Sequence, residues 1–103
     1  MKKRDQPDDE ETILVAETFK LLGDPSRLRI ALAVMDAPVA VGAIAEQLDL
    51  SPSLVSHHLR LLRAARLVRP EREGRTVRYS IHDHHIEHVV KDMLDHIREG
   101  DRS

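Results

Sequence analysis

The chain of 103 residues contains no cysteine, and this absence excludes several kinds of site. Without thiols there can be no disulfide framework and no thiolate metal site. No apolar run approaches the roughly 20 residues of a membrane-spanning helix, and the first residues, MKKRDQPDDEE, include no apolar segment like that of a signal peptide. We therefore expect a soluble, cytoplasmic protein without membrane contact. A disordered tail of residues 1–9 should precede one small folded domain, residues 10–100.

Charge is unevenly spread along the sequence, although the net charge is only −2. Residues 51–80 hold seven arginines and two acidic residues, so this segment carries +5 and the remainder carries −7. An arginine-rich surface that contacts only solvent would explain this uneven charge. The clustering of one sign across a predicted helix and the hairpin after it favours a surface that binds phosphate groups.

Apolar periodicity and capping residues predict four helices before residue 67: residues 10–22, 24–36, 41–48 and a fourth that begins at Ser51. Gly23 should stop the first of them. A tight turn joins the short third helix to the fourth, and Asp49 is expected to adopt the left-handed conformation there. A short helix, a tight turn and a capped helix with polar early positions describe a helix-turn-helix.

Two strand-like segments, residues 67–72 and 76–81, follow the fourth helix and are joined through Gly74. Pro70 has no N–H group to donate, so it predicts an edge strand. A basic β-hairpin after a helix-turn-helix is a wing. The predicted fold is therefore mainly α with a β-hairpin wing, a winged helix-turn-helix.

The fourth helix is expected to enter the major groove of double-stranded DNA. The outward phase of its polar residues makes three of them candidates for contacts with base edges: Ser53, Ser56 and His57. Candidates for contacts with phosphates, from this helix and the wing, are Arg60, Arg63, Arg75 and Arg78. The pattern leaves open whether His58 faces outward or is buried.

The segment from Asp83 to Glu99 predicts one amphipathic helix, which Gly100 should close. Beside its apolar stripe runs a second stripe whose members can all bind a metal ion: His85, His88, Asp92, His96 and Glu99. His85 and His96 lie about 16 Å apart along a helix. Because imidazole–zinc bonds are about 2 Å long, one ion cannot contact both within a single chain.

Two copies of this helix in antiparallel arrangement remove that obstacle. Residue pairs with nearly the same sum of residue numbers then lie at the same level, so His85 meets His96 of a second chain and Asp83 meets Glu99. The register predicts a homodimer with two four-ligand sites shared between subunits. A solvated polar face of a dimer helix would explain the same pattern, and the roles of His88 and Asp92 stay open.

Three segments carry a family resemblance: LLGDPSRLRI (21–30), SPSLVSHHLRLLRAARLV (51–68) and EGRTVRYSI (73–81). With the order of elements, they resemble the ArsR/SmtB family of bacterial metal-sensing repressors. The segment DHHIEHVVKDMLDHIRE is similar to that family's zinc site on the C-terminal helix, D-x-H-x10-H-x2-E/H. Asp83, His85, His96 and Glu99 stand at its ligand positions.

The resemblance implies a homodimer through the N- and C-terminal helices that binds an inverted-repeat operator without metal. Zinc binding would then weaken DNA binding. Two imidazoles and two carboxylates suit tetrahedral Zn(II), and Co(II) can share such a site, whereas Ni(II) prefers more ligands. The family's second, thiolate site needs cysteines near residues 39–42, which this chain lacks.

Three alternative functions fit parts of the pattern. A Ni(II)- or Co(II)-responsive repressor would share this architecture, but the N-terminal MKKRDQ lacks the extra histidines of some nickel sensors. A winged-helix module without metal control would leave the ligand-like residues on a plain surface. HHIEH (84–88) matches the zinc-protease pattern H-x-x-E-H, but the chain is too small for a substrate cleft, so we expect no enzyme activity.

Overall fold

The computed structural model describes residues 6–102, so the tail predicted for residues 1–9 lies outside the described residues as far as residue 5. Helix α1 (Asp9–Leu22) begins one residue earlier than predicted. The reason is a capping box: the Glu11 N–H donates to Asp8 Oδ1 over 2.8 Å, and the Asp8 N–H donates to Glu11 Oε1 over 3.1 Å. Gly23 caps the C-terminal end of α1, as predicted.

The helix-turn-helix is present as the sequence predicts. It consists of α3 (Val41–Leu48) and α4 (Pro52–Ala64), joined by a turn in which Asp49 has a φ of 56°. The Ser51 hydroxyl caps α4 by accepting from the Leu54 N–H over 3.1 Å. Helix α2 (Pro25–Ala33) starts at the predicted Asp24 cap but ends earlier than predicted, because the chain turns there toward a strand.

That strand, β1 (Val39–Ala40), makes the wing part of a three-stranded antiparallel sheet with the order β1-β3-β2. The hairpin itself consists of β2 (Val68–Glu73) and β3 (Thr76–Ile81). Pro70 lies on the edge strand β2, as predicted, and Gly74 turns the hairpin with a φ of 63°. Strand β1 was not predicted, because its two residues are too few to show an alternating pattern in the sequence.

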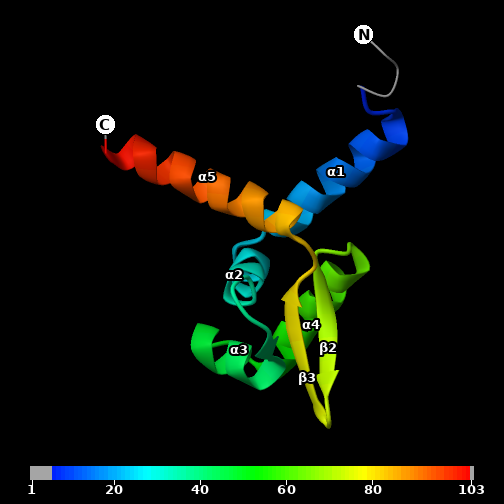
Figure 1. Cartoon of the computed structure of the whole chain (residues 1–103), viewed down its shortest axis with the longest axis vertical. Helices are drawn as coiled ribbons and strands as arrows, with labels where there is room; N and C mark the ends of the chain where they lie inside the picture. The colour runs from blue at the N-terminus through cyan, green and yellow to red at the C-terminus, as the bar shows by residue number, and fades with distance from the viewer. Residues whose placement is uncertain (1–5, 103) are drawn as a thin grey trace.

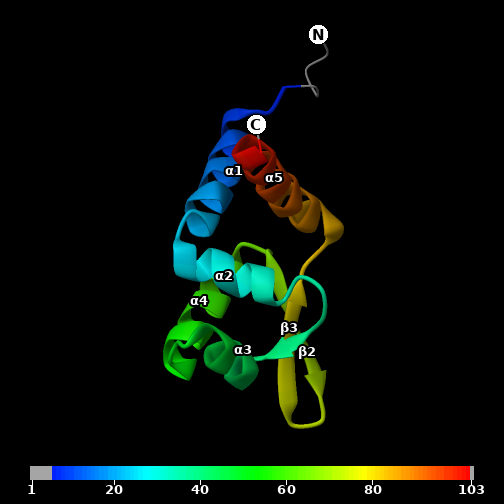
Figure 2. The same ribbon diagram turned by 90° about the vertical axis from the view of Figure 1, so that its left-hand side faces the viewer.

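The hydrophobic core lies where α2, α3, α4 and the start of β2 meet (Figure 2). Its fully buried side chains are Ile30, Val34, Ile44, Val55, Leu59, Leu62, Leu67 and Val68. The helical residues among them follow the predicted periodicity, and Leu67 and Val68 belong to the predicted first strand of the hairpin. The core therefore fixes α4 and the wing relative to each other.

Helices α1 and α5 (His84–Arg102) extend away from this core and diverge from each other (Figure 1). Helix α5 continues through Gly100, so the prediction that Gly100 closes it is wrong. Large apolar side chains on both helices are about half exposed: Ile13, Leu14, Val15, Phe19, Val89, Met93 and Ile97. Within residues 6–102, no helix has the length and apolar content that a membrane crossing demands.

His58, whose burial the sequence left open, is a core residue of α4 with only 8% of its surface exposed. Its Nδ1 atom is buried without a hydrogen-bond partner. Burial lowers the pKa of His58 below its ordinary value, and the charge of the Asp24 carboxylate opposes that shift. The folded state therefore favours the neutral imidazole.

This burial predicts a pH-dependent loss of stability. The unfolded chain binds a proton at His58 near pH 6.5, and the folded chain binds it only at lower pH. The free energy of unfolding should therefore fall as the pH drops below about 6.5, at a limiting slope of roughly 1.4 kcal/mol per pH unit for one proton. Urea denaturation between pH 5 and 8, at one protein concentration, measures this slope.

Replacement of the imidazole isolates its contribution. His58→Leu should remove the part of the pH dependence of the unfolding free energy that His58 contributes. His57→Gln, at the exposed neighbouring position, should leave this pH dependence unchanged. An unchanged slope in His58→Leu would contradict the assignment.

Candidate metal site and nucleic-acid interface

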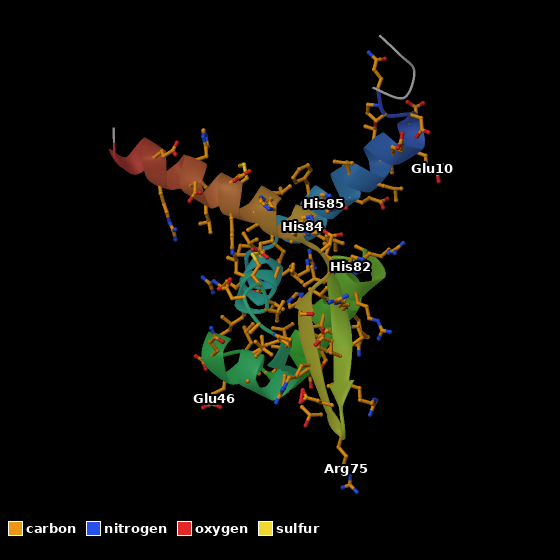
Figure 3. The ribbon with its side chains drawn as sticks, viewed as in Figure 1. Glu10, Glu46, Arg75, His82, His84 and His85 are labelled. Atoms are coloured by element: carbon orange, nitrogen blue, oxygen red, sulfur yellow. The ribbon has the colours of Figure 1, made fainter. Side chains whose placement is uncertain are left out.

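Asp83 and His85 lie together at the start of α5 (Figure 3 labels His85). Asp83 Oδ1 accepts from the His85 N–H over 3.0 Å and from the Ile86 N–H over 3.2 Å, so the carboxylate caps the helix. The same oxygen is 3.5 Å from His85 Nδ1. Both hydrogen bonds end on Oδ1, so Oδ2 is not used by the cap and can bind a metal ion.

The charge of Asp83 is favoured by this position. Burial raises the pKa of its carboxyl, but the hydrogen bonds from the Ile86 and His85 N–H groups and the neighbouring His85 outweigh burial and lower the pKa. A metal ligand must be deprotonated, so the capping position keeps the carboxylate in the form that binds a cation. The His85 side chain is 81% exposed and open to a partner.

The other two predicted ligands, His96 and Glu99, lie about three turns further along α5. Both are exposed, and His96 lines an apolar groove of about 870 Å³ between α1, α2 and α5. Within the part of the chain that the structure describes, no three His, Cys, Asp or Glu side chains are placed to hold a metal ion. Of the four predicted ligands, residues 6–102 of one chain bring together only Asp83 and His85, so a four-ligand site needs a second chain.

Short contacts connect the start of α5 to the helix-turn-helix. The His82 N–H donates to the Leu67 carbonyl over 2.9 Å, and the Leu67 N–H donates to the Leu62 carbonyl of α4 over 2.9 Å. Further along α5, Lys91 Nζ is 3.3 Å from Asp36 and 2.9 Å from Glu87. The candidate ligand Asp83 is therefore one residue away from a hydrogen-bonded connection to α4.

The predicted DNA-contacting face of α4 is largely exposed. Ser53, His57, Arg60 and Arg63 are exposed, whereas Ser56 is half-buried. Sequence reasoning missed Leu54, which is 39% exposed in the first turn of α4. Its phase, about 100° from the buried Val55, could have indicated that it does not face the core. An exposed apolar side chain there can contact a thymine methyl group.

The wing places its two predicted arginines in different surroundings. Arg75 is at the tip of the hairpin and points away from the protein body (Figure 3). Arg78 Nη1 is 3.0 Å from Glu73 Oε1, so its charge is partly compensated within the hairpin. Of the two, Arg75 is therefore freer to bind phosphate.

A model of the arsR family of bacterial regulatory proteins matches residues 24–69, which include α2, the helix-turn-helix and the start of β2. The chain is 42% identical over 87 residues to the transcriptional repressor SmtB homolog of Synechocystis sp., a match that covers 84% of this chain and 66% of that protein. The chain thus spans slightly less than two thirds of that relative's length.

One further relative is similar in sequence, and one solved structure is similar in fold. The cadmium resistance transcriptional regulatory protein CadC homolog of Staphylococcus aureus is 35% identical over 86 residues, which cover 82% of this chain and 71% of that protein. The solution structure of a homodimeric winged helix-turn-helix DNA-binding domain from Mycobacterium bovis superposes with a TM-score of 0.77 at 27% identity. The superposition covers 92% of this chain and 93% of the Mycobacterium bovis domain. The similarity confirms the predicted winged helix-turn-helix fold.

Proposed function

Because this chain belongs to the ArsR family of bacterial regulatory proteins, we propose that it is a metal-responsive transcriptional repressor with Zn(II) as the regulatory ion. The zinc-free homodimer binds an inverted-repeat operator in double-stranded DNA, and zinc weakens this binding. The observation that carries the proposal is the division of the ligands along α5. Asp83 and His85 adjoin at one end, and His96 and Glu99 stand about three turns away, where only a second chain can complete the set.

The exposed apolar faces of α1 and α5 support the homodimer. Phe19 of α1 is 59% exposed and Ile97 of α5 is 57% exposed, and both line the groove between these helices. Large apolar side chains at this exposure on neighbouring helices are typical of an interface. A second copy packed there would place the two α5 helices in contact, as the shared metal sites require.

In the proposed complex, α4 lies in the major groove. Ser53, Ser56 and His57 contact base edges and specify the sequence. The arginines contact phosphates and fix the position of the dimer: Arg60, Arg63, Arg75 and Arg78. Two-fold symmetry of the protein predicts two matching half-sites in the operator.

The ligand positions support a physical route from metal binding to DNA release. Bound zinc would hold the two α5 helices in one mutual geometry by joining ligands from both chains. Asp83 follows His82, whose N–H is hydrogen-bonded to Leu67 next to α4. A shift at Asp83 therefore changes the position of α4 relative to its symmetry mate. The coupling is reciprocal, so DNA must weaken zinc binding by the same factor.

Direct measurement of DNA release tests the proposal. A fluorescent duplex, selected from a random library by the zinc-free protein, is titrated with protein, and anisotropy reports binding. Addition of excess Zn(II) should release the duplex, and a chelator should restore the complex. A duplex that stays bound in excess zinc would contradict the proposed control by metal.

The optical spectrum of the Co(II) form distinguishes zinc-like from nickel-like coordination. Two imidazoles and two carboxylates predict a tetrahedral site, for which the visible bands are strong. Weak bands would indicate an octahedral site and favour the nickel-responsive alternative.

The wing predicts a specific dependence of DNA binding on salt. Arg75→Ala removes one phosphate contact per chain, so the slope of log K against log salt should fall by about 2 for the dimer. Arg78→Ala should change it less, because Glu73 already compensates Arg78. Arg98→Ala on α5, far from the wing, is the control. Equal slopes in Arg75→Ala and the parent would exclude a phosphate contact at the wing tip.

A further inference from the structure

His84 and His88 form a pair on α5 that the four predicted ligands do not include. Their ring centroids are 6.1 Å apart in an edge-to-face arrangement. They are four residues apart, so they project from the helix about 40° from each other and one turn apart. Both residues are exposed. The His84 ring is also 4.8 Å from the His85 ring, which places three imidazoles at this end of α5.

This separation is close to what one metal ion requires. With metal–nitrogen bonds of about 2 Å, the ring centres of two imidazoles on one ion lie roughly 4.5–5 Å apart, about 1 Å less than the separation in this structure. Histidines at positions i and i+4 of a helix are a known arrangement for binding one ion. The exposed side chains of His84 and His88 need only a small rotation to converge.

The pair lies on the side of α5 opposite to the apolar stripe, because Met93 lies about 180° from His84 around the helix. Lys91 is on the same side as the pair, about 20° from His84. It binds Asp36 and Glu87, so the Glu87 carboxylate is already engaged with a cation. A partner chain packed on the apolar stripe would therefore leave the pair open to solvent.

From this geometry we propose that His84 and His88 form a second metal site, complete within each chain, for divalent ions that prefer imidazole. The affinity should follow the general order of such ions, with Cu(II) bound more tightly than Ni(II) or Zn(II). Water completes the coordination. Two protein ligands bind more weakly than four, so this site fills at higher metal concentration than the shared site, and it does not need a dimer.

The experiment titrates Cu(II) into a His85→Ala/His96→Ala variant, which lacks both imidazole ligands of the proposed shared site. We expect one Cu(II) per chain, with nitrogen ligands in its electron paramagnetic resonance spectrum. When His84→Ala or His88→Ala is added to this background, either substitution should lower the affinity for Cu(II) at least tenfold. Circular dichroism confirms folding, and a His85→Gln/His96→Gln background replaces the first if it is unstable.

Asp92→Asn in the same background is the matched control, because Asp92 is also four residues from His88. Loss of Cu(II) in this variant would assign the site to His88 and Asp92 and overturn the proposal. Absence of bound Cu(II) in the background, or equal affinity with and without His84, would overturn it too.

A separate assay keeps this proposal distinct from the regulatory function. In the otherwise unchanged chain, His84→Ala/His88→Ala should release DNA at the same Zn(II) concentration as the parent. If that variant loses zinc-dependent release, the pair belongs to the shared site and the proposed second site is wrong. If the parent itself does not respond to zinc, the proposed regulation fails while the copper result still decides the second site.

Discussion

A His96→Ala variant should bind its operator as the zinc-free parent does and should no longer release it when zinc is added. His96 is exposed on α5 and absent from the buried core, so its loss should leave the fold intact. It supplies one of four proposed ligands in each shared site. Loss of a residue that only supports a ligand costs roughly 10–100-fold in metal affinity, so loss of a ligand should cost about 100-fold or more.

Two measurements on the same preparation check this prediction. Competition with a chromophoric chelator gives the zinc affinity, and anisotropy of the labelled operator gives DNA binding with and without zinc. Asp95→Asn is the control, because Asp95 is exposed on the same helix outside the proposed ligand set. Zinc affinity in His96→Ala equal to that of the parent would remove His96 from the site.

The helix boundaries near the helix-turn-helix could be predicted because interactions within a few residues decide them. Asp24 and Ser51 each cap a helix through one N–H group three residues ahead. The left-handed conformation of Asp49 could be predicted for the same reason, because the tight turn requires it and Asp tolerates it better than most residues. The strand β1 could not be predicted, since Val39 and Ala40 are held by pairing with the distant β3. Gly100 was wrong as a helix end because glycine only weakens a helix that otherwise continues.

The candidate site was predictable to the same extent. The spacing named Asp83 and His85 as ligands of one site, and the structure has them next to each other at the start of α5, whereas their role as ligands stays a prediction. Residues at the edge of an apolar stripe were ambiguous, because helical phase alone does not decide whether such a position faces the core. His58, which the pattern left open, is buried for this reason. Completion of the metal site stays a prediction, since it depends on a second chain.

Met93→Asp should convert the protein to a monomer and reduce DNA affinity by at least about 100-fold. Met93 is 55% exposed in the single chain and lies on the apolar stripe of α5. In the antiparallel register Met93 is level with residues 88 and 89 of the second chain. Each introduced carboxylate would therefore be buried in the interface, and the second carboxylate would lie only roughly 7 Å away along the helix axis. A dimer that engages two half-sites gains roughly 10²–10⁴ in affinity over its separate halves, and the monomer loses this gain.

Met93→Leu separates the effect of charge from the effect of side-chain shape, because it keeps an apolar residue of similar size and should remain dimeric. Sedimentation gives the oligomeric state of both variants, and circular dichroism should show that Met93→Asp stays helical, because Val90 and Ile86 still pack against the protein body. The monomer keeps Asp83 and His85 but loses access to the His96 and Glu99 of a second chain, so its zinc affinity should also fall. A dimeric Met93→Asp would exclude this face of α5 as the interface, and the shared metal site with it.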